Sequence, residues 1–241
     1  MIIYDEMKDP HSLKNWWDQM FLDVTHSYPI KNFSQLDNNF EMKTCVDIGC
    51  NIGCFSYLAS EYFEKIVAFE PGYFTSTIAR TKLNQKERKR NVFIHNLAVG
   101  KNDGDIVKLH CDVHSGQRNS GNSSTVYETE NKEYELVTTV SLEKIFSLCE
   151  TEFIDYLKID CEGAEYGILL EKDLSKIGMI CGEIHGHPTM DFSKARRKLL
   201  NHLSLDFNIS ARKHNFFAIN KKFNINPLEL FKGELYETQS I

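Results

Sequence analysis

A glycine-rich turn at Gly49–Gly53 constrains the fold of this chain more than any other feature. The run Cys45-Val46-Asp47-Ile48 before it is typical of the end of a buried strand, and the residues after it are typical of a helix start. Glycine lets the backbone approach a ligand where a β-carbon would collide. A helix start directs free N–H groups and a positive dipole end at the same place. The turn therefore predicts a strand–turn–helix unit that binds a ligand, with Asp47 as a hydrogen-bond acceptor at the strand tip.

A second apolar run, Ile66-Val67-Ala68-Phe69, ends at the carboxylate of Glu70. An acidic residue about 20 positions after such a turn, at the tip of the next strand, is the expected partner of a ribose diol. The third glycine of the dinucleotide fingerprint is missing, because Ser56 stands at its position. The two features together predict a cofactor that contains adenosine but no pyrophosphate.

Strand and helix patterns alternate from residue 43 onward. Strands are expected at 43–48, 65–70, 91–95, 155–160, 179–184, 206–211 and 215–220, and helices at 54–63, 74–86, 141–149, 164–172 and 193–204. Such alternation implies a parallel sheet with helices on both faces. The connection between the last two strands is too short for a crossover helix, so they must form an antiparallel hairpin. A seven-stranded, mostly parallel sheet that ends in this hairpin is the α/β architecture of Rossmann-like class I methyltransferases.

Two segments depart from this alternation. Residues 1–42 carry Trp16, Trp17, Met20, Phe21 and Val24 at helical spacing after a possible N-cap at Ser12, which fits a helix over the sheet edge or a lid over a pocket. Residues 104–140 hold short strand patterns at 107–110, 125–127 and 136–140, with a polar loop at 114–124 that is either an active-site loop or a solvated connection. We therefore expect an N-terminal cap at 1–42 and a catalytic domain at 43–241, with 104–140 inserted in it.

Composition excludes several classes of protein. The chain has 241 residues, 41% hydrophobic and 26% charged, as expected for one globular domain with decorations. A net charge of −6 argues against a nucleic-acid partner. The seven cysteines include no C-x₂-C pair, which argues against a disulfide framework or a structural zinc site. No apolar stretch is long enough for a membrane span and no signal pattern begins the chain. We expect a cytoplasmic protein.

Charged residues gather at the end of the expected strand at 155–160. Lys158, Asp160 and Glu162 alternate with apolar residues and share one side while the chain is extended. A strand flanked by helices is usually apolar throughout. The end of this strand lies at the topological switch point beside the first strand, where ligands bind in open α/β sheets. The pattern indicates a functional group of side chains rather than a salt-bridged strand terminus.

Glu183, His185 and His187 alternate at the tip of the next expected strand. Three interpretations are open: an acid–base site, a metal site, or histidines without a chemical role. The first is favoured, with Glu183 or Asp160 orienting His185 as a base near neutral pH. No metal is assigned.

These motifs together resemble the FkbM-type family of S-adenosylmethionine-dependent methyltransferases, from about Cys45 to Glu183. The resemblance rests on Val46-Asp47-Ile48-Gly49-Cys50-Asn51-Ile52-Gly53, Val67-Ala68-Phe69-Glu70-Pro71, Asn96-Leu97-Ala98-Val99-Gly100, Thr138-Thr139-Val140-Ser141-Leu142-Glu143, Leu157-Lys158-Ile159-Asp160-Cys161-Glu162-Gly163-Ala164-Glu165 and Glu183-Ile184-His185. Cys50 departs from the small alanine that the family usually has there. The first forty residues and the tail after about 190 match no motif, so the resemblance says nothing about the substrate there.

The resemblance implies a role for each matching residue. S-adenosylmethionine, which leaves as S-adenosylhomocysteine, would contact Asp47, Gly49, Asn51, Gly53, Phe55, Glu70, Pro71, Asn96, Ala98 and Asp160. Of these, Glu70 would hold the ribose hydroxyls and Asn96 and Ala98 would border adenine. The catalytic group would be Lys158, Asp160, Glu162 and His185, with Asp160 or His185 as the base. Arg118, Glu183 and His187 would contact the substrate.

The family typically methylates hydroxyl oxygens of small molecules. We therefore expect an O-methyltransferase that acts on a sugar or a glycan or capsule precursor, with Arg118 as a contact if that acceptor is phosphorylated or nucleotide-activated. The alternatives are an N-methyltransferase of a small amine and a non-catalytic cofactor-binding protein. The oligomeric state is left open, a homodimer included.

Overall fold

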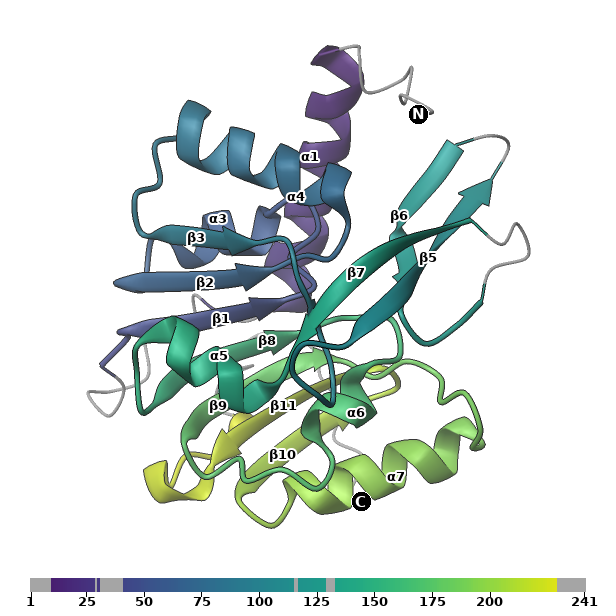
Figure 1. Ribbon diagram of the computed structural model, residues 1–241. Coiled ribbons are helices and arrows are strands. Elements are labelled where there is room, and N and C mark those ends of the chain that lie inside the picture. The colour runs from purple at the N-terminus through teal and green to yellow at the C-terminus, as the bar shows by residue number, and fades with distance from the viewer. Residues whose placement is uncertain (1–9, 29, 31–40, 115–116, 129–132, 229–241) are drawn as a thin grey trace.

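The computed structural model describes residues 10–28, 30, 41–114, 117–128 and 133–228 (Figure 1). Its centre is a seven-stranded sheet in the order β10-β11-β9-β8-β1-β2-β3. The strands are β1 (Thr44–Ile48), β2 (Lys65–Phe69), β3 (Val92–His95), β8 (Ile154–Ile159), β9 (Ile177–Glu183), β10 (Phe207–Arg212) and β11 (Asn215–Asn220). All neighbouring pairs are parallel except β10 with β11 and β11 with β9. The predicted mostly parallel sheet with a C-terminal hairpin is confirmed.

Helices cover both faces of the sheet. The helices α5 (Leu142–Cys149), α6 (Glu165–Leu169) and α7 (Phe192–Leu203) pack on one face, and α1 (Pro10–Ser27) and α3 (Cys54–Ala59) pack on the other. Every residue of β1 and β8 is buried. Alternate side chains of β1 therefore enter opposite cores: Val46 and Ile48 join the first, and Cys45 joins the second. Because β1 and β8 are packed between these two cores, the positions of their ends are fixed.

Helix boundaries differ from the sequence pattern at several points. The expected helix at 74–86 is α4 (Tyr73–Arg80) followed by a π-helical segment, η2 (Thr81–Lys86). The N-cap expected at Ser12 is wrong, because α1 already includes Pro10, a residue favoured in the first helical turn. The cap at Ser141 is confirmed, since its side chain accepts a hydrogen bond from the Lys144 N–H. Among the described residues, no helix combines the length and hydrophobicity that crossing a membrane requires.

A second, four-stranded sheet in the order β4-β7-β5-β6 projects from the main body (Figure 1). It consists of β4 (Ala98–Val99), β5 (Ile106–His114), β6 (Gln117–Ser124) and β7 (Tyr134–Val140). The short strands expected at 107–110 and 136–140 lie within β5 and β7.

The interpretation of 114–124 as a loop and of 125–127 as a strand is wrong. Most of the first segment is β6, a polar strand that pairs antiparallel with β5 around a bulge. The segment forms a strand through its backbone pairing with β5, although its residues have low β-propensity. The chain turns after β6 because the Ser124 hydroxyl accepts hydrogen bonds from the N–H groups of Val126 and Tyr127, at 3.0 and 3.1 Å.

Candidate active site

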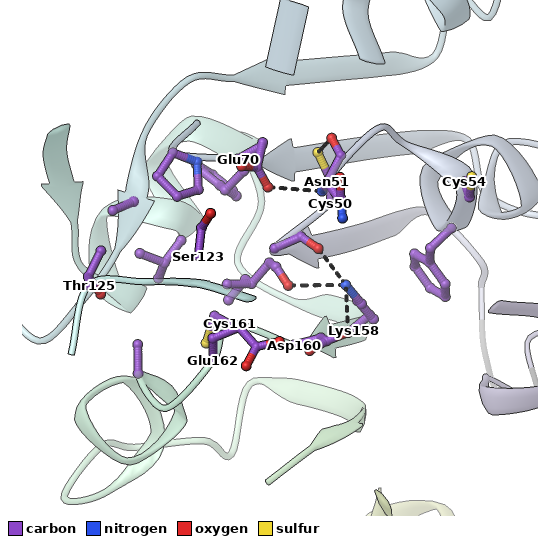
Figure 2. A pocket seen from close by; sticks show the side chains of 18 of the residues that line it. Cys50, Asn51, Cys54, Glu70, Ser123, Thr125, Lys158, Asp160, Cys161 and Glu162 are labelled. Atoms are coloured by element: carbon purple, nitrogen blue, oxygen red, sulfur yellow. Dashed lines mark hydrogen bonds and ion pairs between the residues drawn. The ribbon is translucent and has the colours of Figure 1, made fainter. Parts of the chain in front are cut away.

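A cavity of about 230 Å³ opens at the carboxyl ends of β1, β2 and β8 (Figure 2). The turn after β1, the end of β2 and the residues after β8 form its main walls. Of the residues predicted to bind the cofactor, Gly49, Asn51, Phe55, Glu70, Pro71, Ala98 and Asp160 line it. The predicted catalytic residues Lys158, Asp160 and Glu162 line it as well. One cavity thus brings together two groups of side chains that lie about 100 positions apart in the sequence.

Glycine is required at two positions of the turn, for different reasons. Gly49 has φ 76°, and a β-carbon there would lie 1.8 Å from the backbone oxygen of Asp160. Gly53 has φ 92°, and a β-carbon there would lie 2.8 Å from the Leu83 side chain in η2. Both backbones adopt the left-handed conformation that other residues rarely tolerate. Gly49 therefore lets the turn approach the backbone after β8, whereas Gly53 lets the start of α3 pack against α4 and η2 and does not line the cavity.

Asp47 and Lys158 form a buried ion pair beneath the turn. The Lys158 Nζ lies 3.2 Å from Asp47 Oδ1 and donates a 2.7 Å hydrogen bond to the Gly49 carbonyl oxygen. Ser56 Oγ donates to Asp47 Oδ2 at 2.6 Å. Burial alone would lower the pKa of Lys158, but the charges of Asp47 and Asp160 raise it above its ordinary value. The pair fixes the shape of the turn, and Asp47 does not line the cavity.

Glu70 is the acidic residue at the end of β2, where its side chain is buried at the cavity wall. Its Oε2 accepts from the Asn51 N–H at 2.9 Å. Its Oε1 accepts from the Gly72 N–H and the Thr75 hydroxyl at 2.9 and 2.8 Å. Burial raises its pKa, and these hydrogen bonds oppose that rise. A carboxylate offers about four lone-pair sites, so Glu70 can still accept hydrogen bonds from a ligand.

Asn96 supports the same wall from behind. Its Nδ2 donates to the carbonyl oxygens of Glu70 and Pro71, at 3.0 and 2.7 Å. It holds the chain after β2 and does not line the cavity, unlike Ala98 two residues later.

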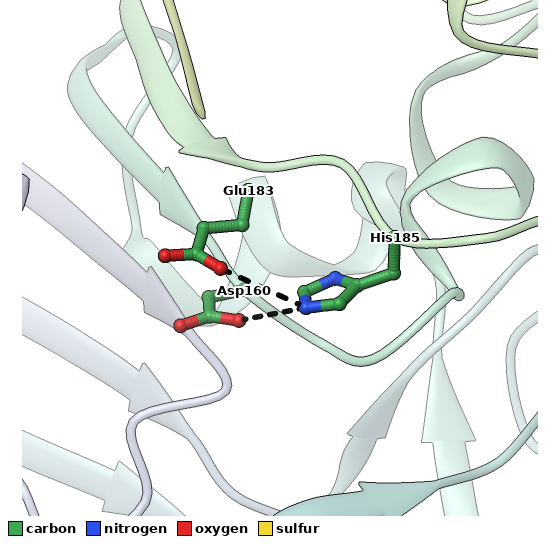
Figure 3. A group of neighbouring side chains, drawn as sticks. All are labelled: Asp160, Glu183 and His185. Carbon is green, nitrogen blue, oxygen red and sulfur yellow. Dashed lines mark ion pairs between the residues drawn. The ribbon is translucent and has the colours of Figure 1, made fainter. Parts of the chain in front are cut away.

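A group of ionisable side chains stands beside the cavity, at the ends of β8 and β9 (Figure 3). The His185 Nε2 atom lies 3.4 Å from Glu162 Oε2, 3.8 Å from Glu183 Oε2 and 3.9 Å from Asp160 Oδ1. Burial raises the pKa of Glu162 to about 7, with Asp160 and Glu165 adding to the rise and His185 opposing it. Burial also raises the pKa of Glu183. The group holds more carboxylates than cations.

Glu165 contacts His185 in the orienting position that the sequence pattern assigned to Glu183 or Asp160. Its Oε1 lies 2.8 Å from His185 Nδ1, and the N–H groups of Cys161 and Gly163 donate to the same fully buried carboxylate. Burial lowers the pKa of His185, but the hydrogen bond and charge of Glu165, with the charges of Glu162 and Asp160, raise it to about 9. The signal was present in the sequence, because Glu165 ends the charged run that begins at Lys158.

The N-terminal helix lines the cavity with two residues of its predicted helical pattern, and Tyr28 directly after it adds a third that no pattern indicated. Met20, Val24 and Tyr28 line it, and the Tyr28 hydroxyl donates to Asp160 Oδ2 at 3.1 Å. Trp17 packs edge-on against Tyr57, with ring centroids 5.9 Å apart. Of the expected cap at 1–42, residues 1–9, 29 and 31–40 lie outside the described part of the chain.

The second sheet also contributes to the cavity through Leu109 and Ser123, and Thr125, directly after β6, lines it as well.

Of the predicted substrate contacts, His187 lies away from the cavity and the side chain of Arg118 is outside the described part of the structure. His187 packs edge-on against Tyr166, with ring centroids 4.9 Å apart, and lines a separate depression. Its Nδ1 accepts from the Thr189 N–H at 3.1 Å. Arg118 lies on β6, and its side chain is outside the described part of the structure. The third, Glu183, stands with His185.

The sequence from residue 47 to 209 matches the model of the methyltransferase FkbM domain. That match covers more than half of the chain. The chain belongs to the FkbM methyltransferase family. The family is one of methyltransferases. The expectations of family and enzyme class are confirmed. No curated protein matches the chain.

Solved structures of methyltransferases match the chain at low similarity. The FkbM methyltransferase of Methylobacillus flagellatus KT is 15% identical with a TM-score of 0.49, over 77% of this chain and 45% of that one. The chain thus spans less than half the length of that relative. TrmK of M. capricolum, in complex with S-adenosylhomocysteine, is 16% identical with a TM-score of 0.41, over 85% and 74% of the two chains. A methyltransferase from Geobacter sulfurreducens is 12% identical with a TM-score of 0.43, over 88% and 89%.

Proposed function

We propose that the protein transfers the methyl group of S-adenosylmethionine to a hydroxyl oxygen of a small acceptor. The observation that supports this most is the single cavity that has the glycine turn and Glu70 at one end and Asp160 and Glu162 at the other. The first end suits a nucleoside and the second suits a reacting hydroxyl. The TrmK structure that holds S-adenosylhomocysteine accords with a nucleoside cofactor of this kind.

The cofactor would lie along the ends of β1 and β2. Its ribose hydroxyls would donate to Glu70, with adenine beside Pro71 and Ala98 and the methionine end over Gly49 and Asn51. The sulfonium and ammonium groups are cationic, so a carboxylate in a partly dry site stabilises them. Asp160 supplies that carboxylate at the far end of the cavity.

The reaction needs an acceptor oxygen in line with the methyl carbon and the sulfur. Positioning alone can contribute several kcal/mol. The oxygen forms a bond to the methyl carbon while the carbon–sulfur bond breaks, which leaves neutral S-adenosylhomocysteine. The hydroxyl proton goes to the group of Asp160, Glu162 and His185, because a protonated hydroxyl is a poor nucleophile. Tyr28, directly after α1, would cover the reacting end together with Met20 and Val24 of that helix, as a lid.

We propose a sugar or a glycan precursor as the acceptor. Carboxylates accept hydrogen bonds from neighbouring sugar hydroxyls, and Asp160, Glu162 and Glu183 offer them at the reacting end. The same negative charge would repel a phosphate close to these residues. We therefore favour an acceptor whose reacting end is uncharged, with any phosphate placed farther away.

A small amine is the second candidate acceptor. The surplus of carboxylates around His185 is complementary to an ammonium group, and this observation favours it. A panel of sugars, sugar nucleotides and amines, assayed by the S-adenosylhomocysteine released, separates the two.

Glu70→Gln is expected to raise the Kd for S-adenosylmethionine by about 10-fold or more. A hydrogen bond to a charged group contributes about 1.5–3 kcal/mol, and the amide keeps the shape while removing the charge. Isothermal titration calorimetry measures the Kd, and urea unfolding checks that the variant is folded. Glu143→Gln, on α5 and paired with Lys172, is the control. A Glu70→Gln protein that binds the cofactor like wild type would place the ribose elsewhere.

A further inference from the structure

One donor atom from each of Asp160, Glu183 and His185 lies within 4.8 Å of the others. Asp160 follows β8, Glu183 ends β9 and His185 comes two residues later. Because β8 and β9 are parallel neighbours, their carboxyl ends bring these side chains to the same edge of the sheet. The cluster is half-buried and Asp160 reaches from it into the cavity, so it stands between the sheet and the proposed acceptor.

The distances within the cluster differ from those of a hydrogen-bonded network. The His185 Nε2 atom is 3.8 Å from Glu183 Oε2 and 3.9 Å from Asp160 Oδ1, which is too long for a hydrogen bond. Two ligand atoms that each lie about 2.1 Å from one first-row metal ion are about 3 Å apart at right angles and about 4 Å apart when opposite. The observed separations fall inside this range. Both distances from Nε2 are therefore compatible with ligands of one shared ion.

The imidazole is held as a metal-binding histidine usually is. Its Nδ1 atom pairs with Glu165 Oε1 at 2.8 Å, and Glu165 is itself fully buried and fixed by backbone N–H groups. Histidine ligands almost always donate their other ring nitrogen to a carboxylate or carbonyl, which fixes the ring and its tautomer. The arrangement leaves Nε2 directed at Asp160 and Glu183 (Figure 3).

The net negative charge of the cluster also favours binding of a cation. Glu162 adds a carboxylate 3.4 Å from the same Nε2 atom. In the described part of the chain, Lys158 is the one lysine or arginine that forms an ion pair with any of these carboxylates, at 3.9 Å from Asp160. Lys158 already neutralises buried Asp47 at 3.2 Å. The cluster therefore keeps a surplus of negative charge.

We propose that Asp160, Glu183 and His185 bind one divalent metal ion, with the remaining coordination positions open to water and to the acceptor. A donor set of one imidazole and two carboxylates suits Mn²⁺, Fe²⁺ or Zn²⁺ better than Ca²⁺. Its role in catalysis rests on the proposed function. The ion holds the acceptor hydroxyl beside the cavity and lowers the pKa of that hydroxyl. The proton then passes to Glu162, which remains free of the ion, before the oxygen–carbon bond forms and the carbon–sulfur bond breaks.

Binding is tested with Mn²⁺ by electron paramagnetic resonance, on protein first treated with EDTA and then dialysed. We expect one Mn²⁺ per chain, and an increase in Kd of at least about 10-fold in each of His185→Gln and Glu183→Gln. Zn²⁺ should compete for the same site. The controls are Glu143→Gln, a surface acid on α5, and His202→Gln on α7, both outside the cluster, and they should bind like wild type. Circular dichroism confirms that each variant is folded.

The proposal is overturned if wild-type protein binds neither Mn²⁺ nor Zn²⁺, or if the cluster variants bind them as the controls do. A separate calorimetric titration with S-adenosylmethionine, in the presence of EDTA, distinguishes this failure from a failure of the proposed function. The metal role is supported if S-adenosylmethionine still binds in EDTA while turnover falls, and if added Mn²⁺ restores turnover. Turnover unchanged in EDTA removes the metal from the reaction but leaves the methyltransferase proposal standing.

Discussion

Asp160→Asn is expected to lower kcat at least about 100-fold, the scale of a positioned acid–base group. Asp160 lines the cavity, accepts a hydrogen bond from Tyr28 and faces His185. Asparagine keeps its size but cannot take a proton or provide the negative charge. The Kd for S-adenosylmethionine should change far less than kcat, because Glu70 and the glycine turn remain.

The assay follows release of S-adenosylhomocysteine at saturating cofactor and acceptor. Glu143→Gln is the matched control, since it removes a carboxylate from a surface pair on α5. Turnover of Asp160→Asn within about threefold of wild type, with the cofactor bound, would rule out Asp160 as part of the reacting group.

Lys158→Met is expected to lower the free energy of unfolding by about 3–5 kcal/mol, the usual loss when one partner of a buried ion pair is removed. The change would leave the fully buried Asp47 carboxylate without its cation and would delete the hydrogen bond to the Gly49 carbonyl oxygen. Urea unfolding measures the effect.

The double variant Asp47→Asn/Lys158→Met should lose less free energy of unfolding than the two single variants lose in sum. In the double variant no buried charge is left unpaired. Lys172→Met is the control: its pair with Glu143 is largely exposed on the Glu143 side and should contribute at most about 1 kcal/mol. Equal losses in Lys158→Met and Lys172→Met would contradict the structural role of the buried pair.

The main sheet was predictable because its inner strands β1, β2, β8 and β9 are buried and mostly apolar and alternate with helical patterns. The strand starting at Asn215 follows β10 after a connection too brief for a helix, and this alone required the antiparallel hairpin. The polar strand β6 could not be predicted, since its pairing with β5 depends on backbone hydrogen bonds rather than on side-chain pattern. Local sequence likewise did not indicate the π-helical η2.

The residues of the site that directly follow a strand could be predicted from the sequence. Gly49, Glu70 and Asp160 line the cavity, as their positions after β1, β2 and β8 implied. Asp47 has the same kind of position but is turned inward by Lys158, a long-range contact that no spacing reveals. Tyr28 escaped notice because only the folded chain brings it to Asp160, 132 positions away.

We expect the protein to transfer a methyl group from S-adenosylmethionine at the cavity between Glu70 and Asp160. The most direct test incubates the purified protein with S-adenosylmethionine and the acceptor panel, and identifies products by mass spectrometry. We predict an acceptor carrying one added methyl group on oxygen, one S-adenosylhomocysteine released per methyl transferred, and loss of both products in Asp160→Asn. Failure of the wild-type protein to bind S-adenosylmethionine, or product formation undiminished in Asp160→Asn, would contradict the claim.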